Sequence, residues 1–344
     1  MSTTIRDVAK KAGVSPATVS LVLNNRSGIS DDTRLVVLEA VDALGYKIVH
    51  PVRPPKNAGS ICFLKIARHG HIINRDHNAF ISDYIDGIEN EAREQGYGLE
   101  VRNYNTFDLS LILKDLSHSP VDGVIILATE LNEEDIVPFG KISIPVVFID
   151  ACHPVHPFDF VDMDNEGAVY SIVRAFKDLG HTDIGMVTAS LKTRNFLQRE
   201  KYFAEAIQYF GLRTDRNWLY TVDSTYEQSS LDMEKQLKGK EGLPTAFFCV
   251  CDIIAFGCIK ALKKSGLRIP GDISVVGFDD LPSSKISDPP LSSIKVSKTR
   301  IGRRAFQLLL RRLHANGELP YEKTFIGSSL VIRESLSARL ENGE

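Results

Sequence analysis

The chain has 344 residues, of which 43% are apolar and 25% are charged, and this length is enough for two or three domains. No apolar run reaches the roughly 18 to 20 residues that are needed to cross a bilayer. The N-terminal sequence MSTTIRDVAKKAG lacks the apolar segment of a secretory signal. These features exclude a membrane-spanning or exported protein, and we expect a cytoplasmic location.

The cysteine pattern argues against disulfides and against a metal site. The five cysteines are an odd number, lie mostly in apolar runs and include no second pair at zinc-binding spacing; they are Cys62, Cys152, Cys249, Cys251 and Cys258. Buried thiols in a reducing compartment are the better interpretation. We expect neither a metal nor a cofactor.

Charge is distributed unevenly along the chain. The formal net charge is −3, but residues 1–60 hold eight Lys or Arg against five Asp or Glu. A basic N-terminal segment on an acidic body is typical of a protein whose first domain alone meets phosphates. The charge distribution alone does not identify a nucleic-acid-binding domain, so a sequence motif is needed as well.

Residues 4–45 have the pattern of three short helices. Gly13 ends the first; Ser15 caps the second, and Pro16 stands at its first position, where a missing N–H costs nothing. A third helix is expected from Ser30 to Gly45. Helix, tight turn and helix is the helix-turn-helix arrangement, although a plain three-helix bundle has the same periodicity. The proline-rich segment 46–59 then has the composition of a linker.

Beyond residue 59, short apolar runs alternate with amphipathic helices. This alternation predicts parallel sheets that are covered by helices on both faces, in two successive units. Strands are expected at 60–66, 98–104, 123–129, 145–150, 183–189, 245–250, 273–279 and 324–332. Helices are expected near 80–95, 109–117, 166–179, 197–209, 253–265 and 299–314.

Several motifs occur in the order and spacing of one known family. TIRDVAKKAGVSPATVSLVLNN, ISDDTR and LGY resemble the headpiece of the LacI/GalR family of bacterial repressors. PVDGVIIL, IPVVFID, IPGDISVVGFDD and PPLSSIKV continue the resemblance to about residue 336. It implies a small all-α helix-turn-helix headpiece, a two-lobed α/β core like a periplasmic sugar-binding protein, and a homodimer or tetramer on a pseudo-palindromic operator.

The resemblance also implies domain boundaries. We expect a headpiece at 1–47, a hinge linker at 48–59 and a core at 60–340. The N-lobe would comprise about 60–161 and 291–323, and the C-lobe about 162–290 and 324–340. Family members fold the linker into a hinge helix on the operator, but Pro54 and Pro55 are incompatible with one here. We therefore expect an extended tether.

Contacts to DNA are expected from the second helix and its surroundings. Short polar groups and backbone N–H at a helix start suit phosphate, whereas exposed side chains near that start read bases. Leu21 stands where the family often has Arg, so it offers apolar contact, for instance to a thymine methyl, unless it is a core residue. The full expected set, part of it implied only by the resemblance, is Thr4, Ser15, Pro16, Ala17, Thr18, Ser20, Leu21, Asn24, Asn25, Ser30, Thr33, Tyr46 and Arg53.

An effector is expected in the cleft at the carboxyl ends of the strands. By resemblance, Arg199 and Asp279 face this cleft, where the pair could bind vicinal hydroxyls or a carboxylate; a surface position and a turn cap are their plain alternatives. Cys251 stands where many sugar-binding members of the family have Asn. The loss of this amide makes a standard hexose a less secure assignment for the ligand. The expected effector-binding residues are Phe80, Ile81, Asp150, Arg199, Tyr226, Cys251 and Asp279.

These patterns predict a DNA-binding transcriptional regulator, most simply a repressor, that is controlled by a sugar or sugar derivative. An enzyme is disfavoured, since no Gly-rich phosphate loop, paired His/Cys or nucleophile elbow occurs. An exported transport protein is excluded by the headpiece and the missing signal. The alternative is a catabolite-type regulator that is controlled mainly by a partner protein such as a phosphocarrier.

Overall fold

The computed structural model describes residues 4–23, 29–44, 58–71 and 75–339. The chain divides into two compact units, Met1–Pro54 and Pro55–Glu344. None of the described helices is both long and apolar enough to span a membrane.

The first unit contains the three predicted helices, α1 (Ile5–Ala12), α2 (Pro16–Leu23) and α3 (Asp31–Ala43). Gly13 ends α1 with a left-handed backbone (φ 67°), which glycine adopts without steric cost. The buried side chains of the unit come from all three helices and form one small apolar core; they are Val8, Ala9, Val19, Val22, Val37, Ala40 and Val41.

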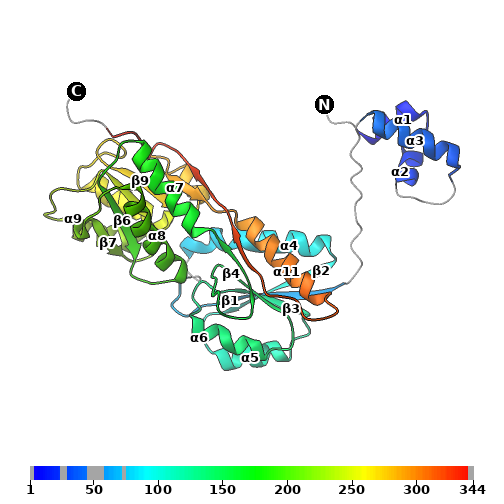
Figure 1. The fold of residues 1–344 in the computed structure, drawn as a ribbon, viewed down its shortest axis with the longest axis horizontal. Coiled ribbons are helices and arrows are strands. Elements are labelled where there is room, and N and C mark those ends of the chain that lie inside the picture. Colours follow the sequence, from blue (N-terminus) through cyan, green and yellow to red (C-terminus); the bar gives the residue numbers. More distant parts are fainter. Residues whose placement is uncertain (1–3, 24–28, 45–57, 72–74, 340–344) are drawn as a thin grey trace. The chain divides into compact units, whose positions relative to one another are not determined.

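The second unit contains two six-stranded sheets, one per lobe (Figure 1). In the N-lobe the strand order is β11-β5-β4-β3-β1-β2, and all pairs are parallel. The strands are β1 (Gly59–Ile66), β2 (Tyr97–Tyr104), β3 (Gly123–Leu127), β4 (Val146–Ile149), β5 (Asp159–Met163) and β11 (Lys323–Ile326). The helices are α4 (Asn78–Glu94), α5 (Leu109–Ser117), α6 (Glu133–Ile136) and α11 (Lys298–Leu313).

Helices cover both faces of the N-lobe sheet, as the sequence predicted. Helices α4 and α11 lie side by side on one face, and α5 and α6 lie on the other (Figure 1). Alternate residues of β1 serve the two layers: Ile61 and Phe63 belong to one apolar cluster, Cys62 and Leu64 to another. This two-residue period is the geometry of a strand that is buried on both faces.

The C-lobe sheet has the order β12-β10-β9-β8-β6-β7, and only β12 is antiparallel to its neighbour. The strands are β6 (Ile184–Ala189), β7 (Leu219–Val222), β8 (Ala246–Cys249), β9 (Ser274–Phe278), β10 (Ser292–Lys295) and β12 (Ser329–Val331). The helices are α7 (Asn165–Asp178), α8 (Arg194–Phe210), α9 (Tyr226–Leu237) and α10 (Asp252–Lys264). Helix α7 packs on α8, and α9 packs on α10.

The expected lobe boundaries differ from the observed strand positions. Strand β10 at 292–295 belongs to the C-lobe sheet, although 291–323 was assigned to the N-lobe. The single strand expected at 324–332 is two strands: β11 pairs with β5 in the N-lobe, and β12 pairs with β10 in the C-lobe. The chain therefore crosses between lobes after β5, after β10 and between β11 and β12.

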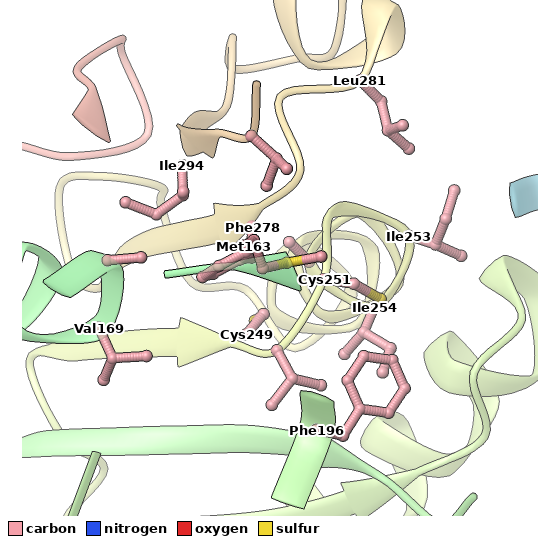
Figure 2. Packing of buried hydrophobic residues seen from close by; sticks show 14 of the residues in the cluster. Met163, Val169, Phe196, Cys249, Cys251, Ile253, Ile254, Phe278, Leu281 and Ile294 are labelled. Carbon is pink, nitrogen blue, oxygen red and sulfur yellow. The ribbon is translucent and has the colours of Figure 1, made fainter. Parts of the chain in front are cut away.

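One apolar cluster continues from the α4 face of the N-lobe into the C-lobe. Figure 2 shows part of this cluster, in which Met163 from the end of the N-lobe strand β5 packs with C-lobe residues that include Phe196, Cys249, Cys251 and Phe278. This apolar packing lies beneath the polar side chains of the cavity between the lobes.

Candidate functional site

A small cavity lies at the carboxyl ends of the strands, between the two lobes. Its volume is about 40 Å³, and the lobes meet around it through contacts such as Asn195 Nδ2 to the Asp150 carbonyl at 2.9 Å and His71 Nδ1 to Ser224 Oγ at 3.2 Å. Side chains from both lobes line it: His71, His77, Phe80, Ile81, Thr129, Asp150, Thr193, Asn195, Phe196, Arg199, Cys251 and Asp279. The carboxyl edge of the sheets is where open α/β folds place ligands.

Arg199, on α8, is the cation of the cavity. It is only 3% exposed, and its guanidinium lies over the ring of Phe278, 3.6 Å from the centroid. Its Nε donates to Asn165 Oδ1 (3.0 Å) and its Nη1 to the Val250 carbonyl (2.6 Å). Nη1 is 3.9 Å from Asp279 Oδ1. Arg199 is therefore held rigidly by the protein before any ligand arrives, which is how a binding group is preorganised.

Asp279 follows β9 and faces Arg199. It is 6% exposed and has a φ of 119°, in a region that L-residues seldom adopt and that costs on the order of 1–3 kcal/mol. Lys298 fixes the turn by donating to the Asp279 carbonyl (2.7 Å). Burial raises the pKa of the Asp279 carboxyl to about 8, against the opposing effect of Arg199. A strained, desolvated carboxyl opposite an arginine is suited to accept hydrogen bonds from a ligand.

Asp150 is the second buried carboxyl of the cavity, at the end of β4 with a φ of 64°. Tyr84 donates to its Oδ1 at 2.7 Å, and Thr129 donates to its Oδ2. Asn195 of the C-lobe donates to its backbone carbonyl at 2.9 Å. Burial raises the pKa of the Asp150 carboxyl, while Thr129 and Tyr84 lower it. Asp150 thus already has partners in the protein and links the lobes.

Asp252, next to Cys251, organises the turn that carries Asp279. It is fully buried and accepts hydrogen bonds from Leu281 N (2.8 Å), Ser284 Oγ (2.6 Å) and Ser293 Oγ (2.6 Å). Burial raises its pKa to about 6, and these three donors oppose that shift. Cys251 itself is 1% exposed, and burial raises the pKa of its thiol. It is therefore an unreactive apolar wall.

Six of the seven predicted effector residues line the cavity: Phe80, Ile81, Asp150, Arg199, Cys251 and Asp279. Tyr226 does not. It is the first residue of α9 and lies against Lys260, whose Nζ is 4.8 Å from the ring centroid, in a separate hollow that is lined by C-lobe residues and by Asp76. Its predicted role in effector binding stays a prediction.

Other lining residues were missed by sequence reasoning. His71 and His77 lie in the segment after β1, and Thr193, Asn195 and Phe196 begin α8. The position of these segments after strands β1 and β6 was the available signal, because parallel strands present their carboxyl ends together.

In the first unit, capping hydrogen bonds set the helix starts. Thr4 donates from both its N and its Oγ1 to Asp7 Oδ2, at 2.8 and 2.7 Å, and this lowers the pKa of the Asp7 carboxyl. Thr18 N donates to Ser15 Oγ (3.0 Å), and Thr33 N to Ser30 Oγ (3.3 Å). These residues therefore act as helix caps as well as being candidates for DNA contact.

The exposed start of α2 agrees with a recognition surface. Ser15, Pro16 and Ala17 are exposed, and Leu21 is 41% exposed, whereas Val19 is fully buried. Leu21 is therefore not a core residue of this unit. The side chain of Ser20 and residues Asn24, Asn25, Tyr46 and Arg53 lie outside the described part, so their predicted contacts stay predictions.

A helix-turn-helix unit joined to a two-lobed binding core defines a ligand-binding DNA regulator. Residues 4–48 match the bacterial regulatory proteins of the lacI family, and residues 173–336 match the periplasmic binding protein-like domain. The HTH-type transcriptional repressor PurR of Mannheimia succiniciproducens is 34% identical over 339 residues, 97% of this chain and 98% of that protein. The chain therefore belongs to the LacI family.

Solved structures show the same fold. The regulator CelR in complex with cellobiose is 24% identical, with a TM-score of 0.72 over 97% of this chain and 99% of that one. The lac repressor dimer bound to operator and the anti-inducer ONPF is 24% identical, with a TM-score of 0.71 over 98% and 100%. This chain is a DNA-binding transcriptional repressor of that family with a periplasmic-binding-protein-like effector domain, and it is not an enzyme.

Proposed function

We propose that a sugar or sugar derivative binds in the cleft and changes the affinity of this repressor for its operator. The observation that carries the proposal is the pairing of Arg199 with Asp279, 3.9 Å apart and both almost fully buried at the cavity. A guanidinium supplies donors and the carboxyl supplies acceptors, which together suit vicinal hydroxyls. Phe80 and Phe196 supply apolar walls for the ring.

The known relatives of this chain support two different ligands. Solved relatives of the same fold hold cellobiose, ribose and glucose, whereas the similar curated sequences are PurR repressors. Two aromatic contacts in this cleft are edge-to-face, His71 with Phe196 at 86° and Phe80 with Tyr84 at 84°, whereas the His71 and His77 rings lie at 35°. The Arg199–Asp279 pair favours the sugar, and a purine is the alternative ligand.

The experiment measures operator binding by titration calorimetry or mobility shift, with a panel of pentoses, hexoses, cellobiose and purine bases. Asp279→Ala and Arg199→Ala are expected to abolish the response to the active compound and to keep operator binding, because only ligand contacts are removed. Arg199 also holds Asn165 and Val250, so Asp279→Ala is the cleaner of the two variants. A wild-type ligand response in Asp279→Ala would sink the assignment.

The repressor also needs a second copy to read a palindromic operator, and we propose a homodimer. In the C-lobe, Ile286 is 85% exposed beside Ile253, Phe256 and Lys260, in a hollow of about 660 Å³. In the N-lobe, β2 is an edge strand and its Val101 is 40% exposed. Contact between two copies of the chain would cover both the exposed apolar hollow and the open sheet edge.

A second candidate, control by a partner protein such as a phosphocarrier, is favoured by a basic groove along α11. Arg300, Arg303 and Arg304 line a hollow of about 770 Å³ together with Phe325, which is 54% exposed. Arg303 pairs with Glu91 (3.0 Å) and Arg304 with Glu322 (2.9 Å), while no ion pair involves Arg300 in the described part. An arginine cluster beside an exposed aromatic suits an acidic or phosphorylated surface.

The two candidates are separated by operator titrations with and without the phosphorylated carrier. Control by the partner predicts that Arg300→Glu removes the carrier's effect and leaves any sugar response unchanged. Control by the small ligand predicts that the carrier has no effect in either protein.

A further inference from the structure

Two histidine side chains lie ring to ring, tilted against each other, in the N-lobe wall of the cleft. The ring centroids of His71 and His77 are 3.9 Å apart with an interplanar angle of 35°. The two residues are only 8% and 7% exposed. Histidine is the residue whose charge changes near neutral pH, so a closely packed and buried pair makes their protonation matter.

The pair lies where the two lobes meet. His71 Nδ1 is 3.2 Å from Ser224 Oγ, in the turn before α9 of the C-lobe. The His71 ring also meets the ring of Phe196, on α8, edge to face at 5.6 Å. Nearby, Tyr226 N donates to Asp76 Oδ2 at 3.1 Å. Because each contact joins residues of different lobes, all of them require the closed cleft.

The surroundings favour uncharged imidazoles. Burial lowers the pKa of His71, and His77 and Arg199 lower it further. Burial also lowers the pKa of His77, against the opposing effects of Asp76, the Ser224 backbone and Glu130.

Asp150 and Asp279 line the same cavity, but in the described part of the chain neither forms an ion pair with a histidine. His77 Nε2 is buried without a hydrogen-bond partner. Protonation of either imidazole would place a positive charge in this buried site; Asp76 and Glu130 offset part of the cost at His77, but burial remains the larger effect.

We propose that the His71–His77 pair is a proton-sensitive latch on the effector cleft: the lobes close over two uncharged imidazoles, so closure releases protons and acidification opens the cleft. The latch rests on the proposed function only in that the effector acts by closing the lobes. Since the closed state disfavours the charged form, the closed-to-open ratio falls as pH drops below about 6.5. The fall is up to about tenfold per pH unit for each excluded proton, and the ratio is flat above pH 7.5.

The test uses the full-length protein without effector, with one dye on each lobe. Both labelling positions, Glu134 and Lys238, are exposed, and the five native cysteines are buried, so Glu134→Cys and Lys238→Cys direct the labels. Energy transfer between the dyes is followed from pH 8 to pH 5. The wild type is expected to shift from closed to open, whereas the doubly substituted His71→Gln/His77→Gln protein stays closed.

The matched control is His118→Gln. His118 is exposed at the end of α5, where its Nδ1 contacts the Lys114 carbonyl (2.8 Å), and its loss should leave the wild-type transition unchanged. A wild type without the transition, or a double Gln variant that keeps it, overturns the latch.

Proton NMR of the histidine Cε1–H signals gives a readout that does not need the double variant to fold. Single His71→Gln and His77→Gln proteins assign the two signals, which should stay at the neutral position while energy transfer reports the closed state and should shift to the charged position together with opening. Two signals that titrate near 6.5 at closed-state energy transfer overturn the proposal. Loss of any ligand effect on operator binding, with the pH transition intact, would instead refute the proposed function alone.

Discussion

At the scale of single residues, burial of the Asp279 carboxyl is expected to destabilise the fold at alkaline pH. Its pKa of about 8 is above the ordinary value of 3.8, so the stability it contributes is present in acid and is lost as pH rises from about 4 through 8. Asp279→Asn removes this dependence. We expect the ligand-free variant to melt higher than the wild type at pH 8.5, by on the order of 5 °C, and to lose this advantage near pH 4.

Asp272→Asn is the control for that measurement. Asp272 forms a surface ion pair with Arg268 (2.7 Å), whose hydrogen bond lowers the pKa of Asp272 to about 2. Its small contribution is therefore present above about pH 4 and lost in acid, the opposite direction. Calorimetric scans of the wild type, Asp279→Asn and Asp272→Asn at pH 4 and 8.5 measure the melting temperatures that test this prediction. An Asp279→Asn effect of equal size at both pH values would contradict the raised pKa.

At the scale of elements, we expect one face of α2 to serve folding and the other to serve DNA recognition. Val19 is fully buried and Leu21 is 41% exposed, two positions along one helix. Val19→Ala should destabilise the headpiece by on the order of 2 kcal/mol through a cavity in a very small core. Leu21→Ala should leave the thermal unfolding of the headpiece unchanged and alter operator preference. Helical circular dichroism on heating, paired with binding to operator variants, tests both. An unfolded Leu21→Ala headpiece would assign Leu21 to the core.

The helices were easier to predict than the strands that join the lobes. Capping residues and apolar periodicity placed α5 and α7 within a residue of their observed bounds. Strand β5 was missed, because Asp159 and Asp162 make its sequence polar although both are buried. Asp159 is satisfied by Arg312, whose Nε donates at 2.6 Å from a residue 153 positions away. Local pattern carries no information about such a partner.

The linker is the element whose chemistry departs most from the family resemblance. Pro54 and Pro55 lie outside the described residues, so the extended tether remains a prediction. Each interior proline costs a helix about 3 kcal/mol, more than a short hinge helix recovers by packing on its twin. We therefore expect little operator bending and weak sequence preference at its centre. A circular-permutation bending assay giving a kink of roughly 40° or more would contradict this.

At the scale of the whole molecule, the cleft is assembled by closure, which sets the limit of sequence reasoning about it. Asp150 and Asp279 were predictable because each follows a clear apolar strand. The place of His71 and His77 after β1 was a signal, but their contacts with Ser224 and Phe196 of the other lobe could not be predicted because they depend on how the lobes meet. Likewise, local sequence does not show that Tyr226 lies outside the lining of this cavity.

Assembly of two chains leads to the remaining prediction. A homodimer covering Ile286 and the β2 edge would present two headpieces to half-sites about 34 to 36 Å apart, one turn of DNA. The logarithm of the binding constant should fall steeply with the logarithm of salt concentration, with a slope of about −0.9 for each phosphate neutralised.

Ile286→Glu places a charge in the hollow beside Ile253 and Phe256, and it should give monomers that lose operator affinity while the core stays folded. Exposed Ile332, 62% exposed and outside both proposed contact surfaces, provides the control variant Ile332→Glu, which should remain dimeric. Analytical ultracentrifugation with fluorescence anisotropy on half-site and full-site duplexes measures all of this, and a stable wild-type monomer that binds one half-site tightly would refute it.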